Sequence, residues 1–192
     1  HLASSAYPPM HLHLLIAGLF WPDPAYPDVY QELHLPALET MLGRSGREER
    51  QDEGQEGWLC RAYGIARQQD WPIAPLTLEH DGGTAGTAYW LRADPVHLKI
   101  GRDQLVLADS GTFSISQAEA HAFTEALNRH FGDEGLLFYP LKPDRWYLRL
   151  KTRPSLSTHP LPAAAGKNIN ALLPAGGDAA AWHKLFNEIQ MA

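Results

Sequence analysis

The chain has 192 residues, 44% of them hydrophobic, which is enough for one full domain or one and a half small ones. Its formal net charge is -6, with 22 acidic and 16 scattered basic residues, so no nucleic-acid partner is expected. The only cysteine is Cys60, which excludes an intrachain disulfide and a cysteine-based zinc site and suits a cytoplasmic location.

No apolar run approaches the roughly 20 residues that span a bilayer, so no membrane association is expected. The N-terminus lacks the basic start of a signal peptide, and residues 1–9 are interpreted as an extension. The last residues, 189–192, stop inside an apparent helix, from which we expect the natural protein to be longer.

The N-terminal third begins with an apolar run that predicts a buried strand over residues 11–20, with Ala17-Gly18 near its end. The spacing of Leu35, Leu38 and Leu42 predicts a helix that Pro36 can open. The segments that follow are predicted to be a solvated loop over 43–57, an amphipathic helix over 58–66, and a Pro- and Gly-rich stretch over 70–88 with a turn at 81–83.

Residues 87–152 are predicted to form a compact α+β unit. Its expected strands cover 89–91, 96–100, 104–108, 136–139 and 146–150, with a hairpin turn at 101–103. Ser116 and Glu119 form a capping-box pattern before a helix whose apolar face is predicted to carry Phe123, Leu127 and Phe131, with Gly132 as its stop. A Pro- and Gly-rich connection over 153–176 and a final amphipathic helix follow.

Ten histidines raise the question of a metal site, but their spacing is unspecific. His11 and His13 share one face of the first predicted strand, which is more typical of a strand near solvent, and His80-Asp81 is more typical of a turn than of a ligand pair. Arg61 could lower the pKa of Cys60, although a single cysteine in an amphipathic segment is usually buried and inert. No metal ligand and no catalytic residue is assigned.

Arg92 is the strongest ligand-binding candidate. It ends a predicted strand, where a guanidinium can grip an anion through two hydrogen bonds. Asp94 and Arg145 are weaker candidates for the same site, and the alternative is a surface ion pair between Arg92 and Asp94.

The runs LHLLIAGLFWP, LPALETML, AYWLRADPVHLKIGRDQLVLAD, PDRWYLRL and WHKLFNEIQM resemble a bacterial family described as Rpf-type regulatory protein E or as cofactor-independent phosphoglycerate mutase-like. The order of parts also resembles, more distantly, the cofactor-independent phosphoglycerate mutases of the alkaline phosphatase superfamily. The resemblance implies an α/β fold with a partial alkaline phosphatase-like core and an inserted α+β domain. Residues 10–86 would start the core, 87–152 would be the insert, and 153–192 would return to a truncated core.

One departure from the resemblance concerns catalysis. Ala17 stands where the enzymes carry a metal-binding aspartate, and alanine supplies no ligand for two-metal phosphoryl transfer. The leading hypothesis is therefore a phosphoglycerate mutase-like protein without the metal site, with a regulatory role or a role in binding a small phosphorylated or carboxylated metabolite, and without a cofactor. The alternatives are an active mutase or phosphotransferase that uses Mn, Mg or Zn, and a module that binds a protein partner.

Overall fold

The computed structural model describes residues 14–16, 33–45, 54–101 and 104–191, which divide between two compact units, 1–63 and 64–192. The described residues form a mixed α/β structure of six α-helices, two short 3-10 helices and five strands in small antiparallel sheets. None of the helices in these ranges is long and apolar enough to cross a membrane.

In the first unit, two helices are described. Helix α1 (Pro36–Arg44) confirms the leucine spacing, with Pro36 in its first turn, although none of its residues is buried. Helix α2 (Gly54–Ala62) confirms the helix predicted from residue 58, but it begins earlier and ends before the predicted residue 66. The loop prediction is therefore wrong over 54–57, where Gln55 and Glu56 favour a helix and Glu56 lies in its positively polarised first turn.

Most of the strand predicted over 11–20 lies outside the described residues, and so do Ala17, His11 and His13. Residues 14–16 of that segment are described and belong to no helix or strand. Leu14 is 58% and Ile16 39% exposed, so these two side chains are not buried as the apolar run predicts.

The second unit is built on a three-stranded antiparallel sheet. Its strands are β1 (Tyr89–Arg92), β5 (Arg145–Leu150) and β4 (Leu136–Lys142), in that spatial order. Arg92 pairs with Tyr147, and Tyr147 pairs with Tyr139 on its other side. Strands β2 (His97–Ile100) and β3 (Leu105–Ala108) form a separate ribbon, as expected, while residues 102 and 103 of its turn lie outside the described residues.

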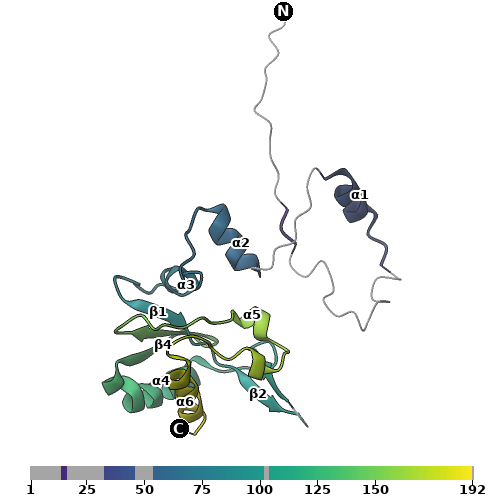
Figure 1. The fold of residues 1–192 in the computed structure, drawn as a ribbon. Helices are drawn as coiled ribbons and strands as arrows, with labels where there is room; N and C mark the ends of the chain where they lie inside the picture. The colour runs from purple at the N-terminus through teal and green to yellow at the C-terminus, as the bar shows by residue number, and fades with distance from the viewer. Residues whose placement is uncertain (1–13, 17–32, 46–53, 102–103, 192) are drawn as a thin grey trace, which may run out of the picture. The chain divides into compact units, whose positions relative to one another are not determined.

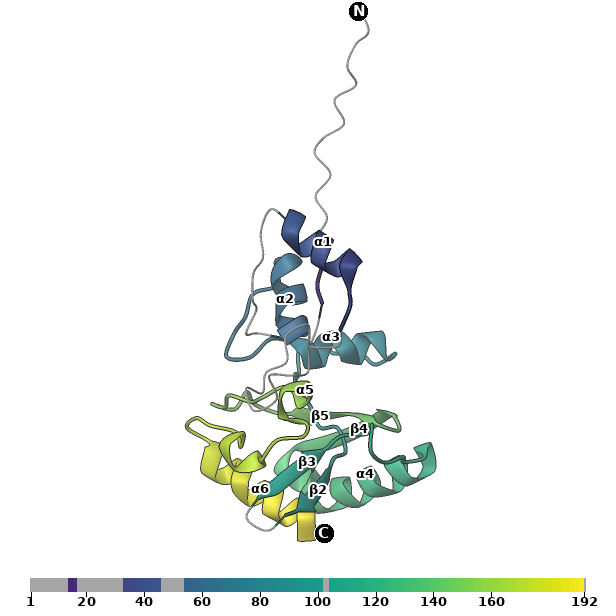
Figure 2. The ribbon, with the colours of Figure 1, turned by 90° about the vertical axis from the view of Figure 1, so that its right-hand side faces the viewer.

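Alternate residues of the three strands face opposite sides of the sheet, as the two-residue period of a strand requires. One side packs Phe138 and Leu148 against helices α4 (Gln117–Phe131) and α6 (Ala179–Met191). The other packs Trp90 and Tyr147 against helix α3 (Ile73–His80). Figures 1 and 2 show α4 and α6 beneath the sheet and α3 above it.

Helix α4 confirms the predicted capping box. The Ser116 hydroxyl accepts from the Glu119 N–H, and the Glu119 carboxylate accepts from the Ser116 N–H. The predicted apolar face is wrong at Phe123, which is 59% exposed, because the helix buries the face that carries Ala120, Thr124 and Phe131. The predicted stop at Gly132 ends the α-helix, but a 3-10 turn (Gly132–Glu134) extends it.

Two segments expected to be irregular contain helices. Helix α3 lies inside the stretch 70–88, whose Pro and Gly content predicts irregular structure, and this stretch includes Pro72 and Pro75. Both prolines lie at the start of α3, where backbone N–H groups have no partner within the helix, so they do not interrupt it. The turn predicted at 81–83 follows directly. The connection over 153–176 contains the short helix α5 (Leu161–Ala164) and a 3-10 turn (Ile169–Ala171).

Candidate functional site

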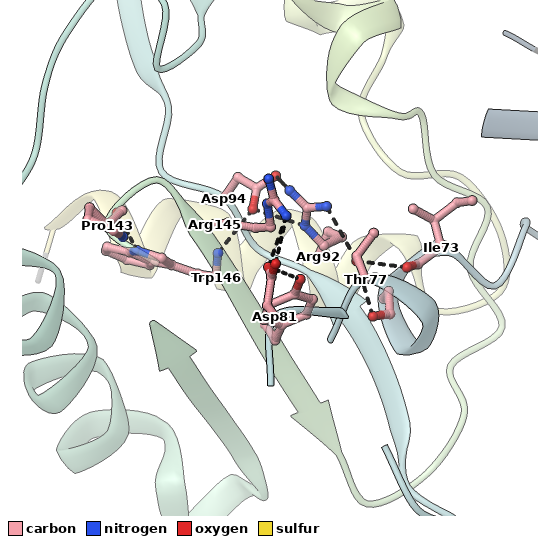
Figure 3. Close-up of polar contacts among 10 residues, drawn as sticks. Ile73, Thr77, Asp81, Arg92, Asp94, Pro143, Arg145 and Trp146 are labelled. Atoms are coloured by element: carbon pink, nitrogen blue, oxygen red, sulfur yellow. Dashed lines mark hydrogen bonds and ion pairs between the residues drawn. The ribbon is translucent and has the colours of Figure 1, made fainter. Parts of the chain in front are cut away.

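The three residues predicted for the ligand site lie together at one end of the sheet, on the face that carries α3. Arg92 ends β1, and its guanidinium donates to both carboxylate oxygens of Asp94 (Figure 3), with 3.1 Å between Nε and Oδ1. The backbone N–H of Trp146 donates to the same Asp94 oxygen at 3.1 Å. The Arg92–Asp94 pair therefore forms, but not as a surface pair, since the Asp94 side chain is only 8% exposed.

Arg145 contacts a second carboxylate, that of Asp81, which immediately follows α3. Its Nη1 lies 2.8 Å from Oδ1 and 3.1 Å from Oδ2 of Asp81. The Lys142 ammonium lies 2.8 Å from Oδ1, and the Tyr147 hydroxyl donates to Oδ2 at 2.7 Å. Asp81 has no exposed side-chain surface, so its charge is neutralised by side chains of β4 and β5 rather than by water.

Tyr147 joins the two ion-paired groups. The Arg92 guanidinium lies 5.5 Å from the centre of the Tyr147 ring, whose hydroxyl donates to Asp81. Thr77, on α3, donates its hydroxyl hydrogen to the Ile73 carbonyl and lies 3.5 Å from Arg92 Nη1. We call these seven residues the polar cluster: Thr77, Asp81, Arg92, Asp94, Lys142, Arg145 and Tyr147.

The pKa values of the two carboxyl groups in the polar cluster are shifted in opposite directions. Burial tends to raise the pKa of Asp81, but the hydrogen bonds from Lys142 and Tyr147 and the charges of Arg145 and Lys142 outweigh it and lower that pKa to about 2. Burial dominates at Asp94 and raises its pKa despite the opposing bond from Arg92. Burial also raises the pKa of Tyr147, so its hydroxyl keeps its proton and donates.

The charges of the polar cluster are arranged with the anions inside and the cations outside. The side chains of Arg92, Lys142 and Arg145 are 27%, 43% and 31% exposed, whereas those of Asp94 and Asp81 are 8% and 0% exposed. Three cations against two carboxylates leave one excess positive charge. The groups that reach solvent are therefore the donors, which suits the recognition of an anion.

Sequence reasoning found Arg92, Asp94 and Arg145 but missed Asp81, Lys142 and Tyr147. From the sequence, His80-Asp81 is a possible ligand pair, but the adjacent glycines favour a turn at Asp81. The available signal was the apolar spacing of Ala74 and Leu78, which marks α3 and so places Asp81 at its end.

The other candidates do not gather into a site. Cys60 is buried, and burial, followed by the charge of Glu56, raises the pKa of its thiol, against the activation considered from Arg61. The side chains of His80, His97 and His159 are exposed. Within the described ranges, no three His, Cys, Asp or Glu side chains lie close enough to hold a metal ion.

Comparisons with protein families, curated proteins and solved structures identify no relative of this chain.

Proposed function

We propose that this protein binds a small phosphorylated or carboxylated metabolite at the polar cluster and has a regulatory rather than a catalytic role. The observation that carries the proposal is the outward arrangement of Arg92, Lys142 and Arg145 around two buried carboxylates. A phosphate or carboxylate that approaches this surface meets donors held in place by their inner partners, so little side-chain freedom is lost on binding.

The proposal includes the partial alkaline phosphatase-like core, the inserted domain and the cytoplasmic location expected from the sequence. Its support for a non-catalytic role is Ala17, which stands where the resemblance places a metal-binding aspartate. An active enzyme with Mn, Mg or Zn is the alternative, and it predicts a mutase rate that a chelator abolishes.

The binding test is a thermal-shift titration with inorganic phosphate and with phosphoglycerate, at an ionic strength held constant with chloride. A ligand that binds only the folded state raises the melting temperature. Once the ligand concentration exceeds Kd, the rise grows with the logarithm of that concentration. Lys142→Gln should reduce this rise, because it removes one exposed cation while Arg145 and Tyr147 still hold Asp81. Arg92→Lys keeps the charge but loses the paired donors, and should also reduce it.

The matched control is Arg129→Gln, which removes an exposed arginine from α4, on the opposite side of the sheet. An equal rise in the wild type and all three variants, or no rise beyond that in chloride, would refute binding at the polar cluster. Activity is tested separately, by a mutase assay with each divalent metal. A chelator-sensitive rate in the purified protein would refute the non-catalytic role.

A further inference from the structure

A cavity lies on the α3 side of the sheet, apart from the polar cluster. Its volume is about 420 Å³, within the range of roughly 300–1,000 Å³ that small-molecule pockets occupy. We call it the loop pocket, and its walls are the 83–88 loop, Leu78, Trp90, Tyr139, Leu141 and Arg149. None of these residues belongs to the polar cluster.

The walls of the loop pocket are held in place by contacts of their own. The Trp90 indole N–H donates to the Ala85 carbonyl at 2.8 Å, which ties the loop to β1. The Trp90 and Tyr139 rings meet edge to face, with centroids 5.4 Å apart. Gly83 lies so close to α3 that a Cβ there would come within 2.7 Å of Leu78 Cδ1. The loop pocket is thus formed before any ligand arrives.

Arg149 is the one charged residue among the walls. It lies on β5 directly opposite Trp90, and the two-residue strand period puts it on the same face as Tyr147. Its side chain is exposed, and no hydrogen bond or ion pair links its guanidinium to another described residue. It therefore differs from Arg92 and Arg145, whose donors already hold carboxylates.

We propose that the loop pocket binds a small organic acid, with the apolar body against Trp90, Tyr139 and Leu141 and the acidic group on Arg149. Apolar walls with one convergent charged group are typical of such sites. A guanidinium binds a carboxylate or a phosphate through two parallel hydrogen bonds, so both acids fit the charge. The site is independent of the polar cluster, and either proposal can fail without the other.

The test uses three probes that share one ring system: naphthoate, naphthyl phosphate and naphthol. Binding to the full chain is measured by heteronuclear NMR, with the Trp90 indole N–H as the reporter. Both acids should shift this signal and bind at least about tenfold more tightly than naphthol. Arg149→Gln should remove that preference and leave the binding of naphthol unchanged, whereas Arg129→Gln should change nothing.

A blocking variant tests the location. Thr87 is an exposed wall residue, so Thr87→Trp should fill the loop pocket and weaken all three probes without touching Arg149. If that variant unfolds, Thr84→Trp provides a second exposed position from which to block the loop pocket. The proposal is overturned if the acids bind no better than naphthol, if Arg149→Gln keeps the preference, or if the Trp90 signal does not move.

Discussion

The two faces of the three-stranded sheet are built on different principles, although the same three strands supply both. The face covered by α4 and α6 is apolar, and Phe131, Phe138 and Leu148 on this side are nearly inaccessible to solvent. The face covered by α3 is apolar around Trp90, but charged side chains surround Asp81 at its other end. Buried charges stabilise a fold less efficiently than apolar packing of similar volume. The charged end is therefore the better place to look for function, and the apolar face the better place to look for stability.

The largest loss of stability is expected when a large buried side chain is removed from the apolar face. Phe131 has no exposed surface and packs with Phe138 and Leu185, so Phe131→Ala should lower the free energy of unfolding by about 3–5 kcal/mol. Urea denaturation measures this directly. The control on the same helix is Phe123→Ala, which should stay within about 0.5 kcal/mol of the wild type, since Phe123 is 59% exposed. Equal losses in both variants would contradict the assigned orientation of α4.

A smaller loss is expected from the ionic end of the other face. Asp81→Asn removes the charge that Lys142 and Arg145 share, and should lower the free energy of unfolding by about 2 kcal/mol. The figure is below that for a fully buried pair, because both cations are partly exposed and can regain water. Denaturation at neutral pH gives the value. A loss as large as that of Phe131→Ala would contradict the expectation that the ionic end stabilises the fold less than the apolar face does.

Acid should distinguish Asp81 from Asp94. The pKa of Asp81 is lowered from 3.8 to about 2 in the folded state, so its stabilisation is present above pH 4 and is lost as the pH falls towards 2. The contribution is at most about 2 kcal/mol. The pKa of Asp94 is raised instead, so its contribution is largest when it is protonated and decreases as the pH rises through its folded-state pKa.

The measurement is the free energy of unfolding as a function of pH between 2 and 7 for the wild type, Asp81→Asn and Asp94→Asn. Asp81→Asn should flatten the decline towards acid, whereas Asp94→Asn should leave that decline in place. Identical profiles for the two variants would show that the carboxyl groups are not shifted in opposite directions.

The smallest effect is expected at the start of α4, which covers the apolar face. Ser116→Ala removes the capping box and should cost about 1 kcal/mol. Ser114→Ala, two residues earlier and exposed, is the matched control and should change little. Thermal denaturation resolves the difference. A larger loss in Ser114→Ala than in Ser116→Ala would contradict the assigned cap.

Local patterns in the sequence determined most elements of the second unit. The capping box identified α4, and short apolar runs between turn residues identified all five strands. Arg92 and Asp94 could be paired in advance because they stand two positions apart. These signals have periods of two or 3.6 residues and act between near neighbours, so a single chain segment contains them.

Tertiary structure alone decided which distant residues meet. Asp81 lies 64 positions from Arg145 and 66 from Tyr147, and the three come together because α3 packs on the sheet in which β5 lies between β1 and β4. On the opposite side of the sheet, packing against Phe138 and Leu148 determines which face of α4 is buried, and Phe123 stays exposed against expectation. Strand order and register depend on the free energy of the whole assembled core, and the pattern of any one segment contributes only a small part of that sum.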